Sequence, residues 1–163
     1  MTTAIYPGSF DPITLGHLNI IKRAAQTFDQ VVVCVMVNGS KYSPLFSIDE
    51  RVELIRRVVE RFPNVQVDCS GDLLAEYAKK YEKPVVVKGL RAISDFESEF
   101  QMALINKKFN HELETCFMAA SEKYTYLSST IVKELGKYGA DLREFVPVEI
   151  LREVQDRTKE LKK

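Results

Sequence analysis

The feature that most limits the fold of this chain is a nearly continuous run of apolar residues from Gln30 to Val37. A strand with one face in water would alternate polar and apolar positions, so this run predicts a parallel strand covered on both faces. Val85–Val87 is a second run of β-branched residues, with Pro84 before it. We therefore expect an α/β protein built on a parallel sheet.

Three more segments have the composition of strands, and helical patterns separate all five. The expected strands are 3–6, 30–37, 65–68, 85–87 and 115–119. Apolar residues at three- and four-residue spacing predict helices that begin near Thr14, Ser47, Leu73, Ser94, Ser128 or Ser129, and Pro147. Residues 1–163 should form a single-domain, doubly wound (Rossmann-like) α/β fold, with helices on both faces of a five-stranded parallel sheet and a C-terminal helix.

Local signals suggest how three of these helices begin. Ser47 with Glu50, and Ser94 with Glu97, have the Ser-x-x-Glu spacing of a capping box, in which the two side chains bind each other's backbone N–H groups. Asp72 is a candidate cap for the helix at Leu73.

Charge and cysteine content exclude several protein classes. The chain has 163 residues, with 23 Lys and Arg against 23 Asp and Glu, a balance that disfavours nucleic-acid binding through broad phosphate neutralisation. Cys34, Cys69 and Cys116 show no C-x-x-C spacing, so we expect reduced thiols. There is no signal-peptide pattern and no apolar run near 18 residues, so we expect a cytoplasmic protein with no membrane partner.

A loop rich in turn residues follows the first expected strand. Residues 7–12 read Pro-Gly-Ser-Phe-Asp-Pro, and the helix after them opens with Thr14-Leu15-Gly16-His17. A strand, a loop and a helix start in this order present free backbone N–H groups and the positive end of a helix dipole to an anion. Thr14 and His17 are three residues apart, so both can project from the first turn toward one ligand.

Other polar residues follow the carboxyl ends of the expected strands. Lys41 follows the second strand, Lys88 and Arg91 end the fourth, and Ser128–Thr130 come after the fifth. In a parallel sheet these ends form one rim, where ligands of open α/β sheets bind. A histidine, three cations and two helix starts on one rim predict a polyphosphate site.

Each of these residues also has a purely structural interpretation. Lys41 and Lys88 could be solvated surface lysines. Arg91 could form a surface salt bridge with Asp95 or Glu99. Ser128–Thr130 could serve merely as helix caps, with no role in binding. His111 is interpreted as structural or solvent-facing.

Rival motifs are absent from the sequence. It has no G-x-x-x-x-G-K-[ST] P-loop, no G-x-G-x-x-G after a strand, no G-x-S-x-G and no Cys/His pair for covalent catalysis. It has no cluster with metal-ligand spacing either, so we expect no metal bound by the protein alone. Any divalent ion would arrive with the nucleotide phosphates.

The string from Tyr6 to His17 resembles the T/H-x-G-H nucleotidyltransferase signature, and most closely that of the phosphopantetheine adenylyltransferase family of bacteria. The resemblance covers essentially the whole chain. It continues in Ser40-Lys41, 46–52, 72–74, 88–92, 95–97, Glu99 and 127–134.

The resemblance implies transfer of AMP from ATP to 4′-phosphopantetheine, giving dephospho-CoA and pyrophosphate in the penultimate step of coenzyme A synthesis. It also implies Mg²⁺ with ATP, dephospho-CoA and CoA as further ligands, and a homohexamer. In-line attack of one phosphate on another needs no protein nucleophile, only alignment and charge stabilisation.

The same resemblance assigns roles to individual residues. His17, Lys41 and Arg91 would be catalytic: His17 donates to the α-phosphate, Lys41 bridges the two reacting phosphates, and Arg91 binds the β- and γ-phosphates. Residues implied for the acceptor are Ser9, Lys41, Leu74 and Lys88. Residues implied for ATP are Ser9, Phe10, His17, Gly89, Leu90, Arg91, Glu99, Tyr124, Thr125, Tyr126, Leu127, Ser128, Ser129 and Thr130.

Two positions depart from the usual family pattern. Ser9 stands where Thr is common and keeps the hydroxyl, whereas Lys88 stands where Arg is frequent and replaces a bidentate fork by a point charge.

The acceptor could be another phosphomonoester, such as nicotinamide mononucleotide or a polyol phosphate. The chain could also be a regulatory nucleotide-binding module without turnover. An aminoacyl-tRNA synthetase is disfavoured, because this neutral chain has no basic extension for tRNA.

Overall fold

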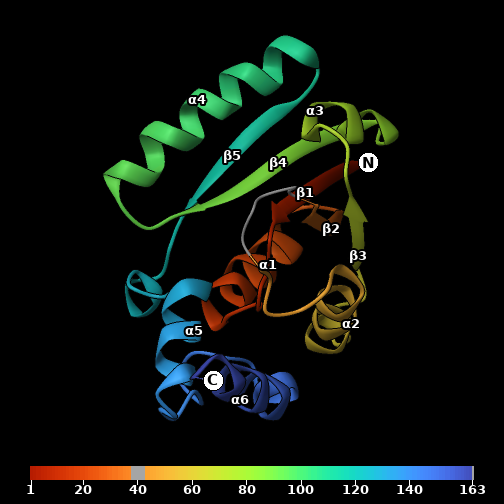
Figure 1. Cartoon of the computed structure of the whole chain (residues 1–163). Helices are drawn as coiled ribbons and strands as arrows, with labels where there is room; N and C mark the ends of the chain where they lie inside the picture. Colours follow the sequence, from red (N-terminus) through yellow and green to blue (C-terminus); the bar gives the residue numbers. More distant parts are fainter. Residues whose placement is uncertain (38–42, 163) are drawn as a thin grey trace.

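A computed structural model of the chain describes residues 1–37 and 43–162. It contains one five-stranded parallel sheet with helices on both faces, as the sequence predicts (Figure 1). The strands are β1 (Thr2–Gly8), β2 (Gln30–Met36), β3 (Val65–Ser70), β4 (Lys83–Leu90) and β5 (Glu114–Ala119). The helices are α1 (Leu15–Thr27), α2 (Ile48–Val59), α3 (Leu74–Tyr77), α4 (Ile93–Phe109), α5 (Ser129–Lys137) and α6 (Leu151–Lys159), with short 3₁₀ turns at 78–80, 122–124, 148–150 and 160–162.

The strand order is β3-β2-β1-β4-β5, so the chain starts in the middle of the sheet and winds outward in both directions. The direction of winding reverses between β1 and β4, which lie side by side in register, with Ile5 opposite Val86. Such a reversal leaves a crevice beyond the carboxyl ends of the two strands. The topology therefore places the expected binding rim at the ends of β1 and β4.

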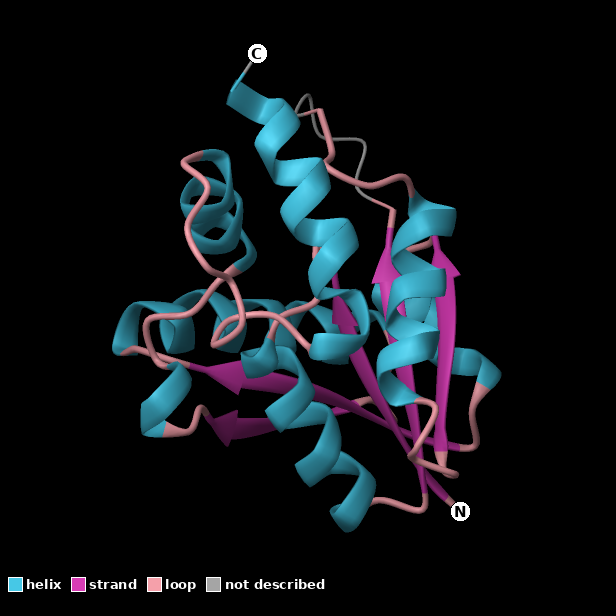
Figure 2. Ribbon diagram, turned by 90° about the horizontal axis from the view of Figure 1, so that it is seen from below, coloured by secondary structure: helices cyan, strands magenta, loops and turns pink. Residues whose placement is uncertain are grey.

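The two faces of the sheet pack against different helices. Ala4, Tyr6 and Val33 belong to the larger core, which also includes residues of α1, α2, α5 and α6. Ile5, Cys34 and Val86 point to the other face, where they pack with Ala75 and Tyr77. Figure 2 shows the sheet between these layers, and in Figure 1 α4 lies alongside β4 and β5, away from α5 and α6. Because β1 and β2 are buried on both sides, they lack polar–apolar alternation.

Several helix starts differ from the expectation. Ser47 and Glu50 form the predicted capping box, but the box at Ser94 and Glu97 was wrong, because α4 begins at Ile93 with Ala92 as its N-cap. The Asp95 carboxylate, rather than a serine hydroxyl, accepts the backbone N–H of Arg91, at 3.0 Å. The cap at Asp72 was also wrong: Leu73 is the N-cap of α3 and has no side-chain bond.

Two further elements have other lengths than expected. The helix at 73–81 is a single α-turn followed by a 3₁₀ turn at Ala78–Lys80. Pro147 leads into a 3₁₀ turn, and α6 begins only at Leu151. No helix of the described part of the chain is both long and apolar enough to cross a membrane.

Candidate active site

Two adjoining cavities open at the carboxyl ends of β1 and β4. The first has a volume of about 330 Å³ and is lined by the β1–α1 turn, the end of β4 and the start of α5. The second, about 380 Å³, lies toward α3 and α4. Both are lined by Pro7, Gly8, Ser9, Lys88 and Glu99, so these residues form a shared wall. Two ligands, one in each cavity, would meet at this wall.

The β1–α1 turn is shaped by Phe10, which adopts a positive φ of 47° and is buried. Its ring packs edge-on against Tyr6 and His17, with centroids 5.4 and 5.0 Å away. A Cβ at Gly8 would come within 3.0 Å of the same ring, so only glycine fits there without a shift. A left-handed non-glycine residue is a strained conformation that tends to occur at functional sites.

Thr14 and His17 bind each other at the start of α1. The Thr14 hydroxyl accepts the backbone N–H of His17 at 3.3 Å, and the Thr14 backbone N–H donates to His17 Nδ1 at 3.0 Å. Because a backbone N–H can only donate, Nδ1 must be unprotonated, and the neutral ring carries its proton on Nε2. The cap therefore fixes the tautomer and leaves an N–H donor on the ring that lines the first cavity.

Burial, followed by the nearby charge of Arg91, lowers the pKa of His17 from 6.5 to about 4. His17 is therefore neutral at physiological pH. Burial also raises the pKa of the Tyr6 hydroxyl well above its ordinary value, so this side chain, which lines the same cavity, stays protonated.

We expect this pKa to make folding stability depend on pH through His17. As pH falls, the unfolded chain binds the proton near 6.5 and the folded chain only near 4. The stabilisation is complete above pH 6.5 and is lost as pH falls toward 4. Replacing His17 with Asn should therefore flatten the decrease of Tm across this window. Thermal melts from pH 7 to pH 4 test this, with exposed His111→Asn as the control for losing a histidine; a slope unchanged in the His17 variant would contradict it.

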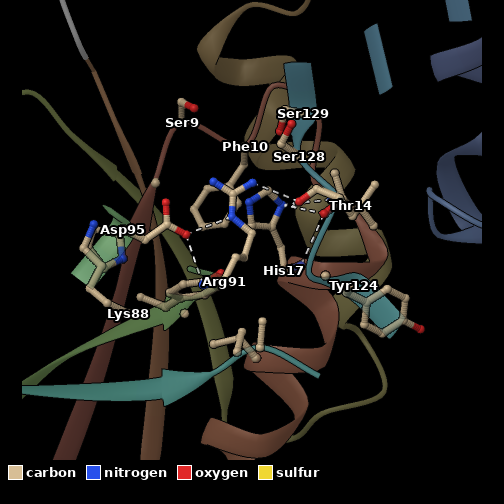
Figure 3. A pocket seen from close by; sticks show the side chains of 18 of the residues that line it. Ser9, Phe10, Thr14, His17, Lys88, Arg91, Asp95, Tyr124, Ser128 and Ser129 are labelled. Atoms are coloured by element: carbon tan, nitrogen blue, oxygen red, sulfur yellow. Dashed lines mark hydrogen bonds and ion pairs between the residues drawn. The ribbon is translucent and has the colours of Figure 1, made fainter. Parts of the chain in front are cut away.

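Arg91 stands at the end of β4 and connects three parts of the site. Its Nε lies 3.2 Å from Asp95 Oδ2, and its Nη1 donates to the Leu127 carbonyl at 3.1 Å, just before α5. Burial alone would raise the pKa of Asp95, but hydrogen bonds from the backbone and guanidinium of Arg91 lower it overall. The interpretation as an ion pair with Asp95 therefore holds, yet Arg91 also lines the first cavity (Figure 3). The ion pair positions the guanidinium and leaves part of it exposed.

Lys88 and the start of α5 complete the polar lining. Lys88 Nζ lies 3.2 Å from Glu99 Oε2 in the shared wall. Ser128 is the N-cap of α5, with its hydroxyl accepting the Ile131 N–H at 3.2 Å, so its capping interpretation holds. The Ser129 hydroxyl donates to the Pro12 carbonyl at 2.7 Å. Both residues line the first cavity, so the N-terminal end of α5 faces the same space as His17 and Arg91 (Figure 3).

The structure gathers most of the expected site residues at these cavities. Lys41 lies outside the described residues, and Leu90, Thr125 and Tyr126 do not line either cavity. Leu74 lines only the second cavity. Those that line the first are Ser9, Phe10, His17, Lys88, Gly89, Arg91, Glu99, Tyr124, Leu127, Ser128, Ser129 and Thr130.

Sequence reasoning missed Asn106. It lies on α4, is only 5% exposed and lines the second cavity. Among residues 1–37 and 43–162 its side-chain amide has no hydrogen-bond partner, so the amide can pair with a ligand in the second cavity. An asparagine that follows Ala103-Leu104-Ile105 in an apolar helix is the signal that could have identified it.

Comparison with known proteins adds independent observations. A family model described as Cytidylyltransferase-like matches residues 5–135. The chain is 56% identical over 147 residues to a protein named phosphopantetheine adenylyltransferase from Caldanaerobacter subterraneus subsp. tengcongensis, covering 90% of this chain and 91% of the relative. Proteins with the same name from Clostridium botulinum and Alkaliphilus metalliredigens are each 50% identical, over 155 and 152 residues; these matches cover 95% and 93% of this chain, and 94% and 96% of the relatives.

Solved structures share the fold at low sequence identity. A putative nicotinate-nucleotide adenylyltransferase from Vibrio parahaemolyticus matches with a TM-score of 0.70 at 19% identity, covering 96% of this chain and 95% of that one. A bifunctional NMN adenylyltransferase/ADP ribose pyrophosphatase from Francisella tularensis matches with a TM-score of 0.68 at 14% identity, covering 99% of this chain and 49% of that one.

Proposed function

This chain belongs to the cytidylyltransferase-like family and, within it, to the phosphopantetheine adenylyltransferases, and from this we infer that it transfers the adenylyl group of ATP to 4′-phosphopantetheine. The products are dephospho-CoA and pyrophosphate, in the penultimate step of coenzyme A synthesis. We propose that residues 1–163 act as one nucleotidyltransferase domain. The cytoplasmic location stays a prediction.

One observation carries the proposal for how the substrates bind: two cavities share a wall that contains Ser9 and Lys88. We propose that ATP occupies the first cavity and phosphopantetheine the second, so that the acceptor phosphate and the α-phosphate of ATP meet at this wall. Holding two reactants in line removes much of the entropic barrier to their reaction. No covalent intermediate on the protein is needed.

Charge stabilisation would come from the groups around the first cavity. The Nε2–H of His17 is proposed to donate to the α-phosphate as negative charge develops on it. Arg91 and the first turn of α5 are proposed to bind the β- and γ-phosphates, which leave as pyrophosphate. Lys41, which lies outside the described residues, keeps its role as a bridge between the reacting phosphates only through the family resemblance.

The second cavity has the chemistry to accept the pantetheine arm. Leu74 and Met102 offer apolar contacts, and Asn106 offers a buried amide that could pair with an amide of the ligand. Lys88 is proposed to bind the acceptor phosphate. Dephospho-CoA and CoA would span both cavities as product and product-like ligands.

A divalent metal is proposed to enter with the nucleotide. Within the described residues no three His, Cys, Asp or Glu side chains come together as a metal site, and Asp95 and Glu99 are paired with Arg91 and Lys88. Mg²⁺ suits this arrangement, because it is commonly held by phosphate oxygens and water with few protein ligands. It would neutralise charge on the triphosphate.

The test of the function is a direct assay. Purified protein is incubated with ATP, MgCl₂ and 4′-phosphopantetheine, and dephospho-CoA is detected by mass. Nicotinamide mononucleotide and a polyol phosphate as acceptors, and CTP as donor, should release little pyrophosphate. A faster reaction with one of them would reassign the substrate, and calorimetric ATP binding without any product would favour the regulatory module.

Replacing Lys88 with Ala should mainly raise KM for phosphopantetheine, by about tenfold or more, because a cation that binds the acceptor phosphate is lost. Lys83→Ala, an exposed lysine at the other end of β4, is the matched control and should leave both KM values unchanged. Steady-state kinetics with each substrate varied in turn measure the effect. A change confined to KM for ATP would mean that the two sub-sites are reversed.

We propose that copies of this chain cover α4, consistent with a homohexamer. Helix α4 is apolar on several sides, and Ile93, Phe100, Leu104 and Phe109 are exposed, Leu104 to 58%. Exposed large apolar side chains gathered on one helix are typical of a surface that is covered by a partner. We expect Leu104→Glu to shift the mass measured by light scattering toward the monomer of 18.6 kDa. Tyr138→Glu, at an exposed aromatic residue beyond α5, should not change the mass; a Leu104 variant with the wild-type mass would contradict the proposal.

A further inference from the structure

A buried carboxylate lies behind the β1–α1 turn, outside both cavities. Asp11 is 7% exposed, and its two oxygens accept the backbone N–H groups of Leu45 and Phe46, at 2.8 and 2.9 Å. These two donors belong to no helix or strand. Asp11 therefore joins the β1–α1 turn to the segment that leads into α2, across 34 residues of sequence.

The same two-residue segment is held on its acceptor side as well. Arg51 Nε donates to the Phe46 carbonyl at 2.8 Å, and Arg157 Nη1 donates to the Leu45 carbonyl at 3.0 Å. All four backbone polar groups of Leu45 and Phe46 are thus bound by charged side chains. Such a segment is fixed without regular secondary structure.

Two cations face Asp11, and both connect it to the lining of the cavities. Arg51, 8% exposed, lies 3.7 Å from Asp11 Oδ1 and also donates to the Ser9 carbonyl at 3.1 Å. Lys133 of α5 lies 3.7 Å from Asp11 Oδ2. One turn earlier on α5, Ser129 holds the Pro12 carbonyl. Asp11 thereby ties together the shared wall at Ser9 and the start of α5.

We propose that Asp11 is a positioning residue for adenylyl transfer: through Arg51 and Lys133 it sets the distance between the wall at Ser9 and the N-terminal end of α5. Its neighbours on the turn are Phe10, which packs on His17, and Pro12, which binds Ser129. The inference rests on the proposed function. Other groups still bind the substrates when the alignment is lost. Replacing Asp11 should therefore lower kcat more than it raises KM.

Asp11→Asn tests this with little change in shape. One of its two backbone donors would face an amide NH₂, and the charge opposite Arg51 and Lys133 would be gone. We expect kcat to fall about 10- to 100-fold while KM for ATP and for phosphopantetheine changes by less than about threefold. Hydrogen exchange at the amides of Leu45 and Phe46 should become faster.

Asn64→Ala is the matched control. The Asn64 amide binds the carbonyls of Ala25 and Phe28 at the far end of α1, so it also holds a chain segment in place but lies remote from both cavities. We expect it to lower Tm and to leave kcat within about twofold of wild type. A purely structural role for Asp11 would give the same pattern, and Asp11→Asn behaving like Asn64→Ala would overturn the inference.

A second variant decides the matter if Asp11→Asn does not fold. Arg51→Lys keeps the charge beside Asp11 but loses the fork that binds Ser9 and Phe46, so kcat should again fall by about tenfold or more. Wild-type kcat in this variant would overturn the inference. A wild-type protein that forms no dephospho-CoA would instead overturn the proposed function, and the inference with it, so the two failures are distinguishable.

Discussion

Replacing His17 with Asn should lower kcat by about 100-fold or more while ATP binding stays largely intact, because a donor used in the transition state is lost. The asparagine oxygen lies close to the place of Nδ1, so it can still accept the Thr14 N–H, whose bond to Nδ1 is 3.0 Å long in the wild type. The cap is kept and the Nε2–H donor is removed. Single-turnover assays of pyrophosphate release, with calorimetry for ATP, measure the two effects separately.

Two further substitutions at position 17 control for this result. His17→Gln reaches toward the place of Nε2 with an amide N–H and should recover part of the lost rate. His17→Ala loses the donor and the Nδ1 acceptor of the Thr14 N–H, while the Thr14 hydroxyl still caps the backbone N–H of residue 17. It should therefore lose similar activity and also about 1 kcal/mol of stability, because one buried N–H is left without a partner. Near-normal pyrophosphate release by the Asn and Ala variants would remove His17 from the mechanism.

Replacing Arg91 with Ala should lower kcat/KM for ATP by about 100-fold or more, because a charge-assisted contact to the leaving phosphates is lost. The loss also frees Asp95, which lies 3.2 Å from the guanidinium and would then repel the triphosphate. Arg91→Lys should recover only part of the rate. The arginine guanidinium can bind Asp95, the Leu127 carbonyl and a phosphate at the same time, whereas the single ammonium group of lysine cannot.

Arg143→Ala provides the matched control for losing an arginine. Arg143 is exposed, pairs with Asp141 and does not line either cavity. Its replacement should leave kcat/KM for both substrates unchanged. If Arg91→Ala instead affected only phosphopantetheine, or neither substrate, the assignment of the first cavity to the nucleotide phosphates would fail.

Local signals predicted the elements well where each signal lies within a few residues. The apolar run at 30–37 and the Ser47–Glu50 capping box are such cases, and both are found where they were expected. The box at Ser94 failed, although its spacing was correct, because Asp95 binds the backbone of Arg91 and starts the helix earlier. A competing acceptor one residue away is not distinguishable by spacing alone.

The rim of the sheet could be predicted because parallel strands all end at the same edge. Ser9, Arg91 and Ser128 are far apart in sequence, yet each follows a strand, and they line one cavity. Asn106 could not be found in this way. It lies inside a helix, and only the packing of α4 beside β4 and β5 places its buried amide in the second cavity.

The sequence by itself determined the α/β class, the five parallel strands and the edge at which the two cavities open, because hydrophobic periodicity and chain direction are local properties. Only the tertiary structure decided the contacts of Asp11, the ion pair of Arg91 with Asp95 rather than Glu99, and the tautomer of His17. These depend on which polar groups come within about 3 Å of each other after folding. For Asp11 the partners are 34 and 35 residues away, and spacing in the chain carries no information about such distances.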